Sequence, residues 1–239
     1  MNLAEEDISI LNKNEMILLK SEKKQDLLQK KALNIINKTG KRLIDIIAGI
    51  VGTIMLIPIT LIIAIINFFE KDKGPLFFTQ KRIGKNGKLF KMYKFRTMIV
   101  GADKELERIL KTDENARKEY KKNKKLKNDP RITKIGNFLR KTSLDEFPQF
   151  INVLKGEMSL VGPRPYLPRE QEDMGYYYYY ITKCKPGITG LWQARGRSNV
   201  DFENRCKLDR FYDEHKGLWF DFKILIWTVV SVFQSKGAK

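Results

Sequence analysis

Residues 143–165 read SLDEFPQFINVLKGEMSLVGPRP, and no other stretch of the chain has so specific a pattern. Two adjacent carboxylates, Asp145 and Glu146, stand where a short apolar helix is predicted to begin. Its apolar stripe is formed by Phe147, Phe150, Ile151 and Leu154. A rigid turn, Gly162–Pro165, follows and can hold the Arg164 guanidinium close to the acids. Adjacent acids facing a fixed cation indicate phosphate chemistry.

The start of this helix has two interpretations. Ser143 and Glu146 have the spacing of a capping box, in which both acids are structural. Pro148 would then lie beyond the first turn and cost a hydrogen bond, whereas a helix that starts near Asp145 avoids this. A helix N-terminus there would offer free amides to a phosphate. Asp145 could then attack phosphorus, and Glu146 could bind Mg²⁺.

Composition limits the kinds of site that the chain can build. Its 239 residues suffice for one core and an accessory segment, and 46 Lys and Arg against 28 Asp and Glu give a net charge of +18. This excess suits nucleic acid, acidic lipid or a phosphorylated substrate. A single histidine, His215, argues against a Ser/His/Asp triad or a multi-histidine metal site. Two cysteines without metal-site spacing fit a reducing, cytoplasm-facing compartment.

An apolar segment of membrane length runs from Leu43 to Phe69, with Asp45 as its only charge. It exceeds the ~20 residues that a spanning helix needs. Pro58 lies near its middle, so we expect two helical limbs of roughly 18 Å each, too short to cross a core of about 30 Å. Because Lys and Arg flank both ends, we predict a re-entrant hairpin with both ends on the cytoplasmic side. A kinked single-pass helix is the alternative.

The predicted fold class is α+β and mostly helical, in three parts. Residues 1–40 form a charged, amphipathic segment that lies on a surface or self-associates, which leaves a homodimer open. Residues 41–70 form the proline-broken membrane hairpin, and residues 71–239 form a cytoplasmic catalytic domain. Its expected elements are a cation-rich β-hairpin (76–83 and 88–95), a charged helical stretch (102–127), a helix opened by Asp129-Pro130, and an interfacial helix (218–233).

Taken together, these motifs resemble the monotopic bacterial sugar-phosphate transferases, a phosphoglycosyl transferase family. The resemblance is carried, in collinear order, by KRLID (41–45), the apolar segment with its proline, GPLFFTQKRIG (74–84), KFRTM (94–98), residues 143–165, KPGITGLWQ (185–193) and WFDFKIL (219–225). The matching stretches extend in collinear order over about residues 41–228, which argues against chance similarity.

The resemblance implies transfer of a hexose-1-phosphate from a UDP-hexose to undecaprenyl (polyprenyl) phosphate at the inner leaflet of the bacterial cytoplasmic membrane. This step initiates exopolysaccharide, capsule, O-antigen or glycoprotein glycan synthesis. It implies that Asp145 attacks the β-phosphorus, releasing UMP and leaving a covalent phosphosugar, and that Glu146 binds Mg²⁺. It also implies substrate-binding residues: Arg96, Arg140 and Arg164 for phosphate, and Gly190, Trp192, Gln193, Gly196 and Arg197 near the nucleotide or sugar. The last block favours galactose or glucose.

Without the resemblance, the residues also allow a second class of function, that of a binding protein without catalysis. A membrane-anchored basic adaptor would bind anionic lipid or nucleic acid without catalysis. Its binding would be salt-sensitive and indifferent to Asp145 and Glu146. The specific features of the chain converge instead on one small acidic site, so we expect an enzyme that has membrane lipid as a partner and no nucleic acid.

Overall fold

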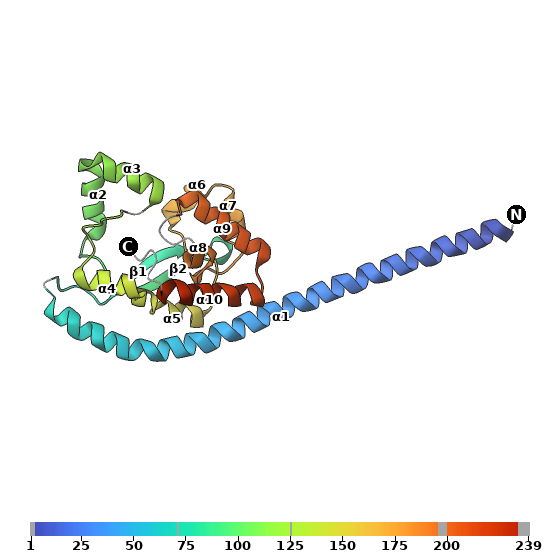
Figure 1. The fold of residues 1–239 in the computed structure, drawn as a ribbon, viewed down its shortest axis with the longest axis horizontal. Helices are drawn as coiled ribbons and strands as arrows, with labels where there is room; N and C mark the ends of the chain where they lie inside the picture. Colours follow the sequence, from blue (N-terminus) through green and yellow to red (C-terminus); the bar gives the residue numbers. More distant parts are fainter. Residues whose placement is uncertain (1–2, 71, 125, 196–199, 234–239) are drawn as a thin grey trace. The chain divides into compact units, whose positions relative to one another are not determined.

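The structure, a computed structural model, describes residues 3–70, 72–124, 126–195 and 200–233. The chain divides into two compact units, Met1–Leu43 and Ile44–Lys239. The first unit is the N-terminal part of helix α1 (Leu3–Phe69), and the second contains the rest of α1 and every other element (Figure 1). Most described residues are helical, with two-stranded sheets between the helices, which confirms the predicted α+β class.

The apolar segment runs as one helix through Pro58, so the predicted break into two limbs is not confirmed. Packing explains the difference. Leu56 and Ile63, on either side of the proline, are both buried in one cluster with Phe95 and Leu139. These contacts offset the one hydrogen bond that a proline removes, and the helix curves along α4 and α5 instead (Figure 1). By length and composition, Leu27–Phe69 could cross a membrane.

Both ends of this segment bond to later parts of the second unit. At its start, the buried Asp45 accepts hydrogen bonds of 2.9 Å from Ser159 Oγ and the Leu160 amide. Near its end, Asn67 Nδ2 donates to the Gly74 carbonyl at 3.3 Å. The other side of the segment exposes a row of large apolar side chains: Ile44, Ile47, Ile50, Val51, Ile54, Met55, Ile57, Leu61, Ile62, Ile65, Phe68 and Phe69.

The predicted β-hairpin is confirmed. Strand β1 (Phe77–Ile83) pairs antiparallel with β2 (Leu89–Phe95), and a short 3-10 turn, η1 (Lys85–Gly87), joins them. Asn86 and Gly87 have positive φ values of 57° and 75°, which is why this turn uses Asn-Gly. Arg82 lies opposite Phe90, and Phe78 opposite Lys94, so both cations project from one face of the hairpin.

The helices after the hairpin differ from prediction in their boundaries. The predicted helical stretch contains two helices, α2 (Ala102–Thr112) and α3 (Glu114–Asn123), and Asp113 caps the second by accepting from the Ala116 amide. Helix α4 (Lys134–Thr142) begins after Thr133, not at Asp129-Pro130. Asp129 does not cap it, because its carboxylate forms a 2.6 Å ion pair with Arg131.

The acidic pair lies in a short 3-10 turn, η2 (Leu144–Glu146), directly before α5 (Gln149–Lys155). Ser143 has a φ of 59° and makes no side-chain capping bond, so the capping box is absent. Gly156 ends α5 with a φ of 77°, as predicted. The remaining elements are β3 (Ser159–Val161), η3 (Pro168–Glu170), α6 (Gln171–Met174), α7 (Tyr177–Ile181), β4 (Gly187–Thr189), α8 (Leu191–Arg195), α9 (Phe202–His215) and α10 (Leu218–Phe233).

The turn at 162–165 is pressed between neighbouring backbone segments. It follows β3, which pairs in parallel with β4. A Cβ on Gly162 would lie 2.3 Å from the Lys185 carbonyl oxygen, and one on Gly190 would lie 2.3 Å from the Gly162 carbonyl oxygen. Only glycine fits at either position, so the backbone that carries Arg164 is held closely.

Candidate active site

Asp145 and Glu146 share one cation, Lys94 of β2. The Lys94 ammonium lies 2.7 Å from Glu146 Oε1 and 3.6 Å from Asp145 Oδ2. Asp145 is buried, whereas Glu146 is half-buried. Lys94 therefore offsets much of the repulsion between two adjacent anions and holds both carboxylates at one place.

The environments of the two acids move their pKa values in opposite directions. Burial raises the pKa of Asp145 above its usual range, and Glu146 adds to this; Lys94 and Arg140 oppose it. Burial acts in the same direction on Glu146, but Lys94, then Arg164 and Gln149, bring its pKa below the usual value. Glu146 is therefore the acid that ionises more readily, and Asp145 is the one whose ionised form burial disfavours.

Glu146 opens onto a cleft in which further cations lie. The lining comes from β1, β2, η2, α5, the 162–165 turn, β4 and α8: Arg82, Met92, Lys94, Glu146, Gln149, Arg164, Pro165, Gly187, Ile188 and Gln193. Arg82 donates 2.9 Å to the Pro165 carbonyl and 2.6 Å to Gln80 Oε1. Burial and the neighbouring Arg164 lower its pKa to about 9, so Arg82 remains charged at neutral pH.

Two buried polar atoms of this lining have no hydrogen-bond partner within the part of the chain that the structure describes. They are Arg82 Nε and Gln193 Oε1. Leaving such a group unpaired costs about 1–3 kcal/mol. One donor and one acceptor in a cationic cleft suit a ligand with both phosphate oxygens and hydroxyls.

The predicted basic residues differ in their placement. Arg140 Nε donates 3.0 Å to Thr97 Oγ1, and its charge acts directly on Asp145. Burial lowers the pKa of Arg140, and Asp145 opposes this change. Arg96 instead forms a 2.6 Å ion pair with Asp72 and donates to several oxygens around the end of α1. The contacts described for Arg96 are those of a structural tie.

The predicted Gly-Leu-Trp-Gln block lies beside Arg164. The buried Trp192 ring has the Arg164 guanidinium 5.5 Å from its centroid and that of Arg205 at 5.0 Å. Gly190 directly precedes α8, and Gln193 follows Trp192 within it. The Gln193 side chain lines the cleft. Gly196 and Arg197 lie outside the described residues.

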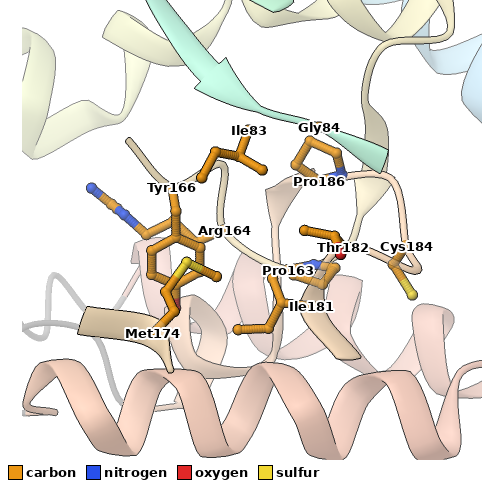
Figure 2. Close-up of a pocket in the computed structure, with 10 residues that line it drawn as sticks. All are labelled: Ile83, Gly84, Pro163, Arg164, Tyr166, Met174, Ile181, Thr182, Cys184 and Pro186. Atoms are coloured by element: carbon orange, nitrogen blue, oxygen red, sulfur yellow. The ribbon is translucent and has the colours of Figure 1, made fainter. Parts of the chain in front are cut away.

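A second, smaller cavity lies behind the turn and is mostly apolar (Figure 2). The Arg164 guanidinium points away from the side chains of Ile181 and Cys184 in this view. Burial raises the pKa of the Cys184 thiol to about 11, so it is not a reactive thiolate at neutral pH. The chemistry therefore belongs to the cationic cleft.

Three residues of this region were missed as site residues: Arg82, Lys94 and Asp209. The strand period could have found the first two, because Arg82 and Lys94 fall on one face of the predicted hairpin. Asp209 lies in α9, and no local pattern marks it. It is fully buried and accepts hydrogen bonds from Tyr166 Oη at 2.8 Å and the Arg164 amide at 3.2 Å.

Asp209 makes the stability of the fold depend on pH. Burial raises its pKa to about 7, from a usual value of about 3.9 in an unfolded chain. The folded state therefore favours the protonated acid, and stability falls as pH rises from about 4 to 7. We expect Asp209→Asn to flatten this dependence in urea unfolding at a series of pH values. Equal slopes for both proteins would contradict the assignment.

The donor set also suits a magnesium ion. Mg²⁺ takes hard oxygen ligands, commonly one or two carboxylates together with substrate phosphate oxygens. Glu146 is half-buried, ionised and on the cleft, with Asp145 beside it. Glu146 is therefore the residue of this cleft whose chemistry could hold such an ion.

Comparison with known proteins identifies the fold family. Residues 36–235 match the family described as bacterial sugar transferase. The chain belongs to this family. It is 44% identical over 97% of its length to an uncharacterized sugar transferase of Haemophilus influenzae. It is 42% identical over 97% of its length to an undecaprenyl-phosphate galactose phosphotransferase of Salmonella typhimurium.

The family includes longer and shorter proteins. The chain spans about half the length of these two relatives, 47% of each. In contrast, it spans 91% of the exopolysaccharide production protein ExoY of Rhizobium meliloti, to which it is 39% identical over 87% of its own length. The matched region includes the cleft, the acidic pair and the second unit's part of α1.

Proposed function

We propose that this bacterial sugar transferase moves a hexose-1-phosphate from a UDP-hexose to undecaprenyl or another polyprenyl phosphate. The observation that carries the proposal is the Asp145–Glu146 pair on Lys94, where Glu146 and Lys94 line a cleft together with Arg82 and Arg164. A diphosphate donor and a lipid phosphate are both anions, which this cleft suits. The name of the Salmonella relative supports the same class of reaction.

The proposed reaction has two displacements at phosphorus. An Asp145 oxygen forms a bond to the β-phosphorus while the bond from that phosphorus to the bridging oxygen breaks, and UMP leaves with the electron pair. A phosphate oxygen of the lipid then attacks the same phosphorus, and the Asp145 carboxylate is released. Lys94 and Arg164 stabilise the charge on the transferring group throughout. Atoms and charge balance without a redox partner.

Glu146 and the bound anions are proposed to hold Mg²⁺. When bound, this ion would polarise phosphoryl oxygens and offset their charge. Arg82, with its Nε free of any described partner, is proposed to bind the donor phosphates. Gln193 Oε1, an acceptor, requires a hydrogen-bond donor on the ligand, and a hexose hydroxyl provides one.

The membrane placement proposed is re-entrant, on the cytoplasmic face. Asp45 and Asn67 tie both ends of the apolar segment to the same compact unit, and the outward row of Ile, Leu and Phe lacks a described partner. A curved helix held at both ends can enter the bilayer from one face and leave by it. Helix α10 adds exposed apolar groups, Trp219, Phe222, Ile226, Val229 and Val230, suited to the interface.

A donor panel tests the reaction. The purified chain in nanodiscs should release UMP from one UDP-hexose, with galactose and glucose as the first candidates, and transfer the sugar phosphate to polyprenyl phosphate. Chelation of divalent ions should suppress the release, and added Mg²⁺ should restore it. No UMP from any UDP-sugar, together with salt-sensitive lipid binding, would favour the adaptor alternative.

Cysteine accessibility tests the placement. Single cysteines at positions 38 and 73, in a chain whose Cys184 and Cys206 are replaced by alanine, should both react from the cytoplasmic side only. A membrane-impermeant thiol reagent applied to intact and to inverted vesicles makes this comparison. Labelling of the two positions from opposite sides would rule out re-entry.

A further inference from the structure

The turn that carries Arg164 is bonded to β4, where the Gly187 amide donates 2.8 Å to the Pro163 carbonyl, and is held from two further sides around Arg164. On one side, β1 binds it: Arg82 donates to the Pro165 carbonyl, and the Ile83 amide donates 2.9 Å to the Tyr166 carbonyl. On the other side, α9 binds it through the single side chain of Asp209. One oxygen, Oδ2, accepts from both the Arg164 amide and the Tyr166 hydroxyl, on either side of Pro165.

Burying the Asp209 carboxylate at this position costs free energy. Its exposed fraction is 0%, and Oδ1 has no partner among the residues that the structure describes. A buried carboxylate loses its hydration, which has to be offset by bonds and by opposite charge. Burial raises its pKa despite the bond from Tyr166, the Arg164 amide and the charges of Arg164 and Arg205. Its bonds converge on the one turn that brings a cation to the cleft.

Trp192 lies beside the same group of charged residues. Arg164 and Arg205 both lie over the Trp192 ring, and both act electrostatically on Asp209. The carboxylate therefore fixes the backbone of Arg164 and offsets charge beside its guanidinium. Without it, nothing described would hold the Arg164 amide.

We propose that Asp209 is a positioning residue that acts through Arg164, holding this guanidinium where it binds the diphosphate of the donor. The proposal rests on the proposed function for the identity of the ligand. Asp209 itself touches no substrate. Its effect should therefore depend on whether residue 164 is an arginine.

A double-mutant cycle on UDP binding tests this dependence. Calorimetric titration of the full chain in nanodiscs with UDP would compare the unchanged protein, Asp209→Leu, Arg164→Ala and the double variant. Leucine keeps the branched shape of aspartate and removes the acceptor. We expect Asp209→Leu to weaken UDP binding about tenfold alone and less than about twofold when Arg164 is already alanine.

Three further variants define the outcome. Asp209→Asn keeps an acceptor oxygen and should bind UDP within about threefold of the unchanged protein. Tyr166→Phe removes one of the two donors, so it should weaken binding in the same Arg164-dependent way, and it serves where Asp209→Leu does not fold. Asp213→Asn, on the same helix but bonded to Cys184 and Lys216, is the matched control and should leave the affinity unchanged.

The proposal is overturned if Asp209→Leu or Tyr166→Phe leaves UDP affinity unchanged, or lowers it by the same factor with and without Arg164. Equal factors would indicate a general structural role. No UDP binding by the unchanged protein would also overturn it. UDP binding with the expected cycle but no UMP release from UDP-sugars would instead retain the proposal and overturn the proposed reaction.

Discussion

Replacing Asp145 by asparagine will abolish UMP release from the UDP-hexose donor. The side chain keeps its shape in η2, but an amide is a far weaker nucleophile than a carboxylate, so the rate should fall by at least about 10³-fold. Steady-state UMP release measures this loss. Because burial raises the pKa of Asp145 and Lys94 keeps its contact with Glu146, a neutral residue at position 145 should not destabilise the fold, which thermal unfolding checks.

Glu146→Gln is the matched comparison for this prediction. Glu146 makes the shorter contact with Lys94 and is the proposed Mg²⁺ ligand. Its loss should slow the reaction and raise the Mg²⁺ concentration needed for half-maximal rate, while leaving Asp145 able to attack. A fully active Asp145→Asn variant, or two variants with identical Mg²⁺ responses, would contradict the separate roles of the acids.

Replacing Lys94 by methionine will lower the rate by about 10²-fold at neutral pH and change its pH dependence. Lys94 is the strongest influence holding down the pKa of Asp145, against burial. Without it the pKa rises further, so a smaller share of Asp145 is ionised at a given pH. The acid limb of kcat/KM should then move to higher pH, and activity should recover partly as pH is raised.

Lys91→Met provides the control for this experiment. Lys91 lies in the same strand, exposed and on the other side of the sheet from Lys94. Its removal lowers the net charge by the same amount without touching the acids. An equal shift of the acid limb in both variants would attribute the effect to overall charge and not to the Lys94 contact.

Local patterns predicted much of the fold. The Asn-Gly hairpin, the glycine that ends α5 and the aromatic helix α10 have strong short-range signals, and the structure has all three. The errors arise where tertiary contacts override such signals. Pro58 does not break α1 because residues on both sides of it pack into one cluster, and Asp129 pairs with Arg131 and so does not begin α4.

The site was predictable only in part for a related reason. Asp145 and Glu146 are neighbours in sequence, so their pairing was visible, and Arg164 follows within a short distance. Lys94 and Arg82 reach them through the hairpin, which required the strand register, and Asp209 reaches the turn from 45 residues away. Arg96 has a motif like that of a substrate ligand, yet its ion pair with Asp72 could not be inferred from spacing.

The covalent intermediate provides the most direct test of the central claim. The chain would be mixed with its UDP-hexose and Mg²⁺ in the absence of lipid phosphate, then quenched and measured by intact-protein and peptide mass spectrometry. We predict a burst of one UMP per active site and one hexose phosphate attached to Asp145, which added polyprenyl phosphate removes. UMP release that requires the lipid phosphate, with no adduct on the protein, would contradict the account.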